Sequence, residues 1–250
     1  MDYLQLMVDL HKRQDRQGPG GVSQTKLALN LTDMDQADHL KVADIGCGTG
    51  ASTLVLANEL NTEITAVDFL GGFLDILNER AAEAGLSNKI STLKCNMEDL
   101  PFDEGVLDLI WSEGAIYNMG FEDGIHSWRR YLKPGGFLVV SEITWTTKRR
   151  PEEIQEYWSR EYAEIDLASV KFSVLENGGY SPVGYFTLPE HCWTENYYLP
   201  ISHSLHGFLE RNSHSEQAEE IAQFETAEFE LYKKFKNYYN YGVYIAKKIG

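Results

Sequence analysis

Three glycines alternate with other residues in the segment VADIGCGTG, which spans residues 42–50. Its first four residues read as the end of a buried strand, and glycines directly after a strand let the backbone come close to a ligand. Gly46-x-Gly48-x-x-Ala51 satisfies the dinucleotide-binding pattern, in which alanine is accepted at the third place. The loop therefore predicts either a dinucleotide pyrophosphate or another nucleoside ligand without phosphates.

Two acidic residues accompany this loop. Asp68 follows about twenty residues later, at the end of the next apolar run, where a carboxylate can bind the ribose hydroxyls of either ligand. Asp44 lies two residues before Gly46, close to the expected place of a pyrophosphate. Because a buried carboxylate disfavours a neighbouring anion, Asp44 favours a ligand that carries an ammonium and a sulfonium instead.

The loop and the segments around it resemble the class I S-adenosylmethionine-dependent methyltransferases. The form Asp-x-Gly-x-Gly-x-Gly at residues 44–50 is that family's first motif, and ITAVDF, CNMEDLPF and LDLIWSEGAIYNM resemble its later motifs. RRYLKPGGFLVVSE is similar to the family's fifth strand with the helix and turn before it. GPGG at residues 18–21 resembles the GPGS of close members, in which N-terminal helices cover the cofactor. The resemblance spans residues 16–145 and points to the small-molecule, type 11-like branch.

This resemblance implies S-adenosylmethionine as the cofactor and assigns residues to it. By this match Asp68 binds the ribose, Phe69 packs against the adenine, and Glu113 faces the methionine half and the acceptor. Asn96 stands where the branch usually has aspartate, so its adenine contact loses a charge. The full implied set is Asp44, Gly46, Cys47, Gly48, Gly50, Asp68, Phe69, Asn96, Met97, Ser112 and Glu113.

The implied reaction is methyl transfer to a small-molecule acceptor by in-line displacement, which needs no metal and no covalent enzyme intermediate. Positioning of the acceptor can supply several kcal/mol, with about 7–11 kcal/mol as the limit in model systems. If the acceptor is a hydroxyl or an ammonium, a general base must take its proton, which contributes about 10²–10⁴-fold. The candidates for this base are Glu113, Tyr117 and His126.

Alternating strand and helix patterns predict how these residues are positioned. Such alternation indicates βαβ units, with ligands at the carboxyl ends of the strands. We expect an α/β fold with a doubly wound, mostly parallel seven-stranded sheet and helices on both faces. The resemblance implies a Rossmann-like methyltransferase fold whose last strand is antiparallel. The expected strands are Lys41–Ile45, Ile64–Val67, Ile90–Cys95, Leu107–Trp111, Phe137–Ile143, Val183–Leu188 and Val243–Ala246.

The chain divides into four expected regions. Residues 1–40 form N-terminal helices that cover the cofactor, and residues 41–188 form the Rossmann-like core. Residues 189–241 are long, aromatic and largely helical, which indicates an insertion or lid that sets acceptor specificity or makes a subunit contact. Residues 242–250 return as the final strand of the core.

Acidic residues dominate the charge of the 250-residue chain: 38 Asp and Glu oppose 22 Lys and Arg, for a formal net charge of −16. Such a surface repels phosphate backbones and disfavours nucleic acid as a partner. Cys47, Cys95 and Cys192 form no CxxC, which favours reduced, cytoplasmic thiols. No segment reaches the ~20 apolar residues that span a membrane, and none reads as a signal peptide. A subunit contact through residues 189–241 would make the protein a homodimer.

Two other functions stay open at this point. A short-chain NAD(P)-dependent oxidoreductase needs Tyr-x-x-x-Lys after the middle strands, whereas the matches, Tyr232–Lys236 and Tyr244–Lys248, lie near the C-terminus. A non-catalytic domain that binds the cofactor or only assembles would keep the glycine loop without turnover. A metal site is disfavoured because the seven histidines include no HExxH.

Overall fold

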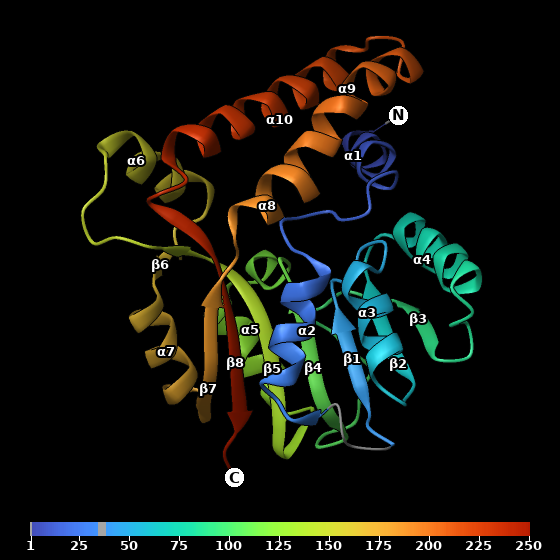
Figure 1. Ribbon diagram of the computed structural model, residues 1–250, viewed down its shortest axis with the longest axis vertical. Coiled ribbons are helices and arrows are strands. Elements are labelled where there is room, and N and C mark those ends of the chain that lie inside the picture. Colours follow the sequence, from blue (N-terminus) through green and yellow to red (C-terminus); the bar gives the residue numbers. More distant parts are fainter. Residues whose placement is uncertain (1, 35–38) are drawn as a thin grey trace.

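One sheet forms the centre of the computed structural model, which describes residues 2–34 and 39–250; residues 1 and 35–38 of the expected N-terminal region lie outside them. The strand order is β3-β2-β1-β4-β5-β8-β7, and a short β6 pairs with β5 (Figure 1). The pairings of β8 with β5 and β7 are antiparallel, and the other pairings are parallel. The strands are β1 (Val42–Ile45), β2 (Ile64–Asp68), β3 (Ile90–Lys94), β4 (Leu107–Glu113), β5 (Leu132–Trp145), β6 (Asp166–Leu167), β7 (Tyr180–Thr187) and β8 (Tyr239–Lys248).

The expected doubly wound sheet is confirmed, with one additional strand. The two-residue β6 is an eighth strand that carries too little pattern to be predicted. The antiparallel last strand is also confirmed, and it lies between β5 and β7 rather than at an edge. Burial explains the apolar runs, because all four residues of β1 and residues 136–145 of β5 are buried. Strands covered on both faces read as continuous apolar segments in this way.

Helices cover the two faces of the sheet with separate clusters of apolar side chains. One cluster joins α2, α3 and α4 to the strands through residues such as Leu29, Leu56 and Leu77. The other joins α5 and α7 to the opposite face through Ile125 and Leu175. The bounds of these helices are α2 (Val22–Asn30), α3 (Ala51–Glu59), α4 (Gly71–Glu83), α5 (Phe121–Arg129) and α7 (Ala168–Asn177).

A third group of helices lies over the carboxyl ends of the parallel strands (Figure 1). Leu6 and Leu10 of α1 pack with Ile201 and Phe208 of α9 and with Ile221 of α10, so the two ends of the chain share one small core. The helices of this group are α1 (Tyr3–His11), α6 (Glu152–Glu161), α8 (Glu190–Trp193), the π-helical turn η3 (Thr194–Tyr198), α9 (Leu199–Arg211) and α10 (Glu216–Phe235).

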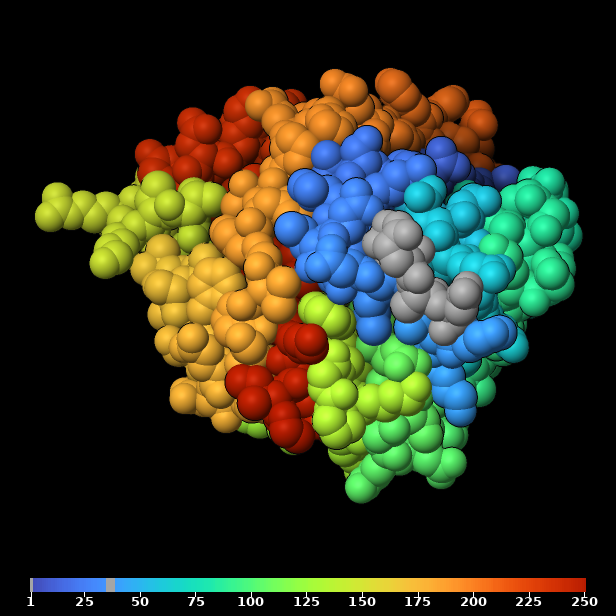
Figure 2. All heavy atoms as spheres, turned by 60° about the horizontal axis from the view of Figure 1, so that its bottom comes forward, coloured from blue at the N-terminus to red at the C-terminus, as the bar shows by residue number. Residues whose placement is uncertain are grey.

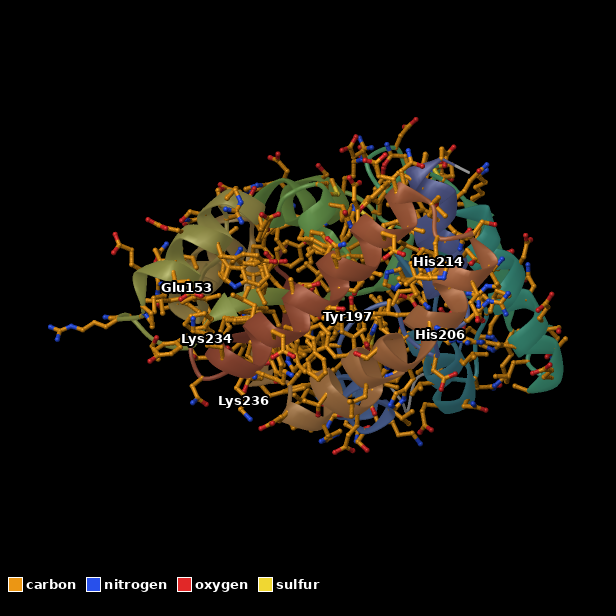
Figure 3. The ribbon with its side chains drawn as sticks, turned by 90° about the horizontal axis from the view of Figure 1, so that it is seen from above. Glu153, Tyr197, His206, His214, Lys234 and Lys236 are labelled. Atoms are coloured by element: carbon orange, nitrogen blue, oxygen red, sulfur yellow. The ribbon has the colours of Figure 1, made fainter. Side chains whose placement is uncertain are left out.

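Ion pairs fix α10 at its C-terminal end. Lys234 of α10 binds Glu153 of α6 at 2.6 Å, and Lys236 binds Glu190 of α8 at 2.5 Å (Figure 3). All four side chains are well exposed, so each pair contributes well under about 1 kcal/mol and mainly sets the position of the helix. Residues 190–235 are helical except for the turn at 212–215, and β8 begins at Tyr239, slightly before the expected residue 242.

The N-terminal segment runs along the body of the molecule rather than away from it. Figure 2 shows this blue segment seated beside α3 and beside the chain that follows β7. The contact with β7 is close, since a Cβ at Gly184 would lie 2.9 Å from Cδ1 of Leu31. Residues 2–34 therefore belong to the same folded unit as the sheet.

Gly50 gives a test of this packing. Its φ is +87°, and a Cβ there would lie 2.1 Å from Cδ1 of Leu77. We expect Gly50→Ala to lower the free energy of unfolding by about 2–4 kcal/mol, because left-handed strain adds to overpacking. Gly85→Ala is the matched control, since Gly85 has a φ of +70° and nothing within 4 Å of that Cβ. Urea denaturation measures both, and equal losses would show that Leu77 yields without cost.

Candidate functional site

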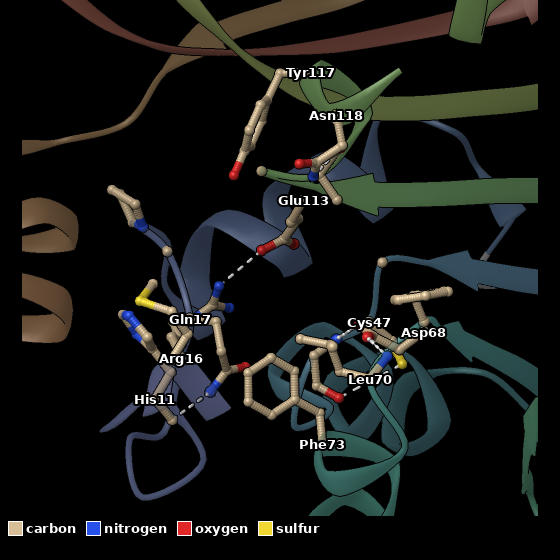
Figure 4. A pocket seen from close by; sticks show the side chains of 18 of the residues that line it. His11, Arg16, Gln17, Cys47, Asp68, Leu70, Phe73, Glu113, Tyr117 and Asn118 are labelled. Atoms are coloured by element: carbon tan, nitrogen blue, oxygen red, sulfur yellow. Dashed lines mark hydrogen bonds and ion pairs between the residues drawn. The ribbon is translucent and has the colours of Figure 1, made fainter. Parts of the chain in front are cut away.

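A cavity of about 810 Å³ opens at the carboxyl ends of β1, β2 and β4 (Figure 4). Its walls are the glycine loop, the end of β2, residues 95–98 and residues 113–118, together with side chains from α1, α6 and α10. In Figure 4, Glu113 and Tyr117 border the opening on one side, and Asp68 and Phe73 on the other. This is the edge where parallel sheets bind ligands, and the volume suits a nucleoside with a small second molecule.

The glycine loop forms one wall and is covered by the N-terminal segment. The N–H groups of Gly46 and Cys47 donate to the carbonyl of Val67 at 2.8 and 3.0 Å, which ties the loop to β2. Gly48 has a φ of +55°, and a Cβ there would lie 2.3 Å from Oε1 of Gln17. Glycine is therefore required where the loop turns and Gln17 approaches.

Asp68 stands at the end of β2 and lines the cavity. Its Oδ2 accepts a hydrogen bond from the Gly48 N–H at 2.9 Å, and its Oδ1 accepts one from the Leu70 N–H at 2.8 Å. Burial raises the pKa of this carboxyl. Phe69 beside it lines the same cavity and is 60% exposed, so its ring offers an apolar face to a ligand.

Asn96 and Met97 form the adjoining wall, in the turn after β3. Oδ1 of Asn96 accepts from the Glu98 N–H at 3.1 Å, so the side chain closes its own turn. The carbonyl of Met97 accepts from Nε1–H of Trp128 at 3.0 Å, which anchors the turn to α5. Both residues are therefore held at the cavity before any ligand binds.

Three residues assigned to the cofactor lie behind the cavity wall instead of on it. Asp44 is fully buried and accepts hydrogen bonds from the hydroxyls of Ser52 and Thr53 at 2.8 and 2.6 Å. Ser112 is fully buried in β4, and Gly50 starts α3 against Leu77. None of the three is among the residues that line the cavity, and their assignment to the cofactor stays a prediction.

Glu113 lines the cavity, but both of its carboxylate oxygens are already occupied. Oε2 binds Nη1 of Arg16 at 2.8 Å, while Oε1 accepts from Thr25 at 2.7 Å and from Trp111 at 3.1 Å. Figure 4 shows the bond to Arg16 crossing from the N-terminal segment to the end of β4. Glu113 therefore anchors that segment, and this role competes with the expected role of a general base.

The structure separates the other two base candidates. Tyr117 lines the cavity in the short helix η2 (Ile116–Asn118), with its ring edge-on to that of Tyr162 at 6.1 Å. His126 is exposed and does not line the cavity, because α5 turns Phe121, Ile125 and Trp128 inward and His126 outward. The structure therefore does not bring His126 together with the other two candidates.

A strap of N-terminal residues over the glycine loop was not predicted. Oε1 of Gln17 accepts from the Thr49 N–H at 2.9 Å, and Nη2 of Arg80 donates to the carbonyl of Gln14 at 2.9 Å. Arg80 also donates to the Thr49 hydroxyl at 2.8 Å. These contacts join residues that are far apart in sequence, so no local sequence pattern could predict them.

The upper part of the cavity was also not assigned from the sequence. It combines aromatic rings with carboxylates, and its members come from α1, α6, η3, α10 and β8. The lining side chains of this group are His11, Tyr157, Trp158, Glu161, Tyr162, Tyr197, Phe224, Glu225, Glu228 and Tyr241. Within residues 2–34 and 39–250, no group of three or more His, Cys, Asp or Glu is arranged to hold a metal ion. In the same residues, no helix is long and apolar enough to cross a membrane.

Part of the chain is similar to a known protein family. Residues 42–136 match the model described as a methyltransferase domain. These matched residues are similar to a methyltransferase domain. The matched segment runs from the start of β1 into β5, so it supplies the glycine loop, Asp68, the turn at Asn96 and the end of β4.

The proteins to which this chain is similar are longer than it or share only its fold. The tocopherol O-methyltransferase of Arabidopsis thaliana is 27% identical over 180 residues, which are 70% of this chain and 47% of that protein. The chain spans less than half the length of the curated relatives it matches. An S-adenosylmethionine-dependent methyltransferase from Geobacter sulfurreducens, solved with S-adenosylhomocysteine, superimposes with a TM-score of 0.83 at 18% identity over 97% of both chains. The [4+2]-cyclase SpnF superimposes with a TM-score of 0.77 at 20% identity, over 99% of this chain and 93% of that one.

Asp68 is the first residue of the cavity to test. We expect Asp68→Ala to weaken binding of S-adenosylhomocysteine by at least about tenfold, the loss typical of a hydrogen bond to a charged group. Asp75→Ala, an exposed carboxylate on α4, is the control. Calorimetry measures the affinity, and circular dichroism shows whether the variant keeps its overall secondary structure. Unchanged affinity would count against the position of the cofactor.

The buried Asp44 predicts a pH dependence of stability. Burial raises its pKa from 3.8 to about 7, so the folded state keeps a proton that the unfolded chain releases near pH 4. Its contribution is therefore favourable below pH 4 and is lost as pH rises to 7, by at most about 4 kcal/mol. Asp44→Asn removes this dependence. Urea unfolding at pH 5 and pH 8 is expected to show the Asn variant gaining stability relative to the parent at the higher pH.

Proposed function

We propose that the chain is an S-adenosylmethionine-dependent methyltransferase that transfers a methyl group to a small-molecule acceptor by in-line displacement. The observation that carries this proposal is the single cavity wall formed by the glycine loop, Asp68 and the turn at Asn96, continuing into an aromatic compartment. A nucleoside cofactor and a second molecule can then meet inside one enclosed space. The name of the tocopherol O-methyltransferase supports an acceptor of small size.

The donor set around the glycine loop fits S-adenosylmethionine better than a dinucleotide. A pyrophosphate needs cations or free N–H groups, but the only Lys or Arg among the described residues that line the cavity is Arg16, which is bound to Glu113. The N–H groups of Gly46, Cys47 and Gly48 already donate to Val67 and Asp68. A cofactor with a positive sulfonium and ammonium suits this acidic wall, whereas NAD would place two phosphates against it.

We assign the contacts of the cofactor to residues that line the cavity. Asp68 would bind the ribose hydroxyls, Phe69 would cover one face of the adenine, and Asn96 with Met97 would border its edge. The loop from Gly46 to Gly48 would approach the methionine half. When bound, S-adenosylmethionine supplies an activated methyl group on a sulfonium.

The residues around the acceptor would act by orientation and by exclusion of water. Desolvation raises the pKa of Tyr117, which favours the protonated hydroxyl and makes this residue a poor general base. Rigid aromatic walls hold an acceptor in one approach to the methyl group, and such positioning supplies several of the about 7–11 kcal/mol available to it.

This arrangement suggests a role for each of the expected regions. Residues 41–188 would hold the cofactor, while residues 1–40 and 189–241 together would form the cover under which the acceptor lies. The cytoplasmic location, the absence of a nucleic-acid partner and the homodimer stay predictions from composition.

Calorimetric titration with S-adenosylhomocysteine, with NADH in parallel, tests the proposal. We expect micromolar binding of S-adenosylhomocysteine and none of NADH. The choice of a ligand assay matters, because SpnF shows that a protein described as a cyclase shares this fold. Binding of NADH alone would overturn the proposal in favour of an oxidoreductase. Binding of S-adenosylhomocysteine would justify an acceptor screen that follows its release from S-adenosylmethionine.

A further inference from the structure

The acceptor side of the cavity is built from aromatic rings and carboxylates. Tyr117 lies across the opening from Asp68, which places it on the side away from the ribose contact (Figure 4). Tyr157, Trp158 and Tyr197 line the same compartment, with Trp158 edge-on to Tyr157 at 5.3 Å between ring centroids. Ring faces attract cations through their quadrupole, so these walls favour a positively charged guest over a negative one.

Three carboxylates stand among these rings: Glu161 on α6 and Glu225 with Glu228 on α10. Glu225 is only 4% exposed, and its Oε1 lies 3.1 Å from Nε2 of His11. Its Oε2 is buried and has no hydrogen-bond partner among the described residues. A buried carboxylate oxygen without a donor is costly, so its place in the cavity wall indicates a donor that arrives with the ligand.

Positive side chains do not balance this compartment. Among the described residues that line the cavity, the basic side chains are Arg16 and His11. Arg16 is bound to Glu113 and His11 to Glu225, so neither is free to take an anion. A phosphate or diphosphate on the acceptor would meet uncompensated carboxylates, which disfavours phosphorylated acceptors.

We propose that the methyl acceptor is an amine without a phosphate group, which enters as a cation and is held by the rings together with Glu228 and Glu225. This inference rests on the proposed function, since it names the substrate class for the same cavity. The methylated product is again an ammonium ion, so the compartment suits both ends of the reaction.

Glu228 is placed to take the proton of such an amine. The charged and titratable groups around it are Glu225 on its own helix, Glu161 on α6, and tyrosines 117, 157, 197, 198, 239 and 241. Burial, reinforced by Glu225, raises the pKa of Glu228 to about 7. A carboxylate with this pKa exchanges protons near neutral pH far more readily than an ordinary glutamate.

The step balances without a further reactant. The ammonium gives one proton to the carboxylate of Glu228, and the freed nitrogen lone pair forms a bond to the methyl carbon. The carbon–sulfur bond breaks with its electron pair going to sulfur. The positive charge passes from the sulfonium to the nitrogen, leaving the thioether S-adenosylhomocysteine.

Calorimetry with choline as the cationic probe tests the inference on the full chain, with and without saturating S-adenosylhomocysteine. The matched probes are 3,3-dimethylbutan-1-ol, a neutral molecule of the same shape, and phosphocholine. We expect choline to bind at least about tenfold more tightly than either, a modest outcome for a cation among rings and carboxylates. Glu228→Gln is expected to lose this preference while keeping its affinity for S-adenosylhomocysteine. Glu230→Gln, an exposed neighbour on α10, is expected to change neither.

The outcomes separate this inference from the proposed function. Binding of S-adenosylhomocysteine with no preference for choline over the neutral probe overturns the amine and leaves the methyltransferase. Choline binding without any binding of S-adenosylhomocysteine overturns the methyltransferase and keeps a cation site.

A turnover assay adds a second test. In a mixed panel of amines and phenols, we expect the amines to be methylated. We also expect Glu228→Gln to move the rate–pH profile to higher pH, because bulk solvent must then remove the proton of the ammonium. Methylation of phenols alone would overturn the inference.

Discussion

The ion pair between Arg16 and Glu113 is the constraint on which the site depends. Both side chains are largely buried, at 10% and 15% exposure, and Thr25 and Trp111 donate to the same carboxylate. Loss of one partner of such a pair leaves a buried charge, which costs about 3–5 kcal/mol. The pair fixes the N-terminal segment to the end of β4. It also explains Gly20 of the GPGG motif, where a Cβ would lie 2.1 Å from Nη1 of Arg16.

Once residues 16–25 are fixed, the remaining cover follows. Gln17 is brought onto the glycine loop, and the helix before it, α1, is placed against α9 and α10. Asp9 of α1 then binds Arg211 and Asn212 at 3.2 Å, and His11 reaches Glu225. One wall of the acceptor compartment is thus made by the first residues of the chain and another by residues more than two hundred positions later. The two walls contact each other where His11 meets Glu225.

The side of the cavity proposed for the cofactor could be predicted from the sequence, because each of its residues belongs to a local motif. Asp68 and Asn96 directly follow strands, and parallel strands bring their carboxyl ends to one edge, so sequence order alone places such residues together. The burial of Asp44 was a different matter, because only the packed structure shows that Ser52 and Thr53 take its carboxylate. The periodicity of Phe121, Ile125 and Trp128 already turns His126 outward, which its sequence position alone did not reveal.

On the acceptor side, the sequence indicated the region, residues 189–241, but not the individual residues that line the cavity. Glu225 and Glu228 read as charges of a solvated helix, and only the fold turns their side of α10 toward Tyr117 and Tyr157. This difference between the two sides has a physical reason. A cofactor that is the same from one enzyme to the next can be bound at a rigid sheet edge. The acceptor compartment is lined mainly by helices from outside the matched segment. The acidity of the chain is then more than a surface property. Part of it is carried inside the cavity, where the unpartnered Oε2 of Glu225 and the neighbouring Glu228 favour a positively charged guest.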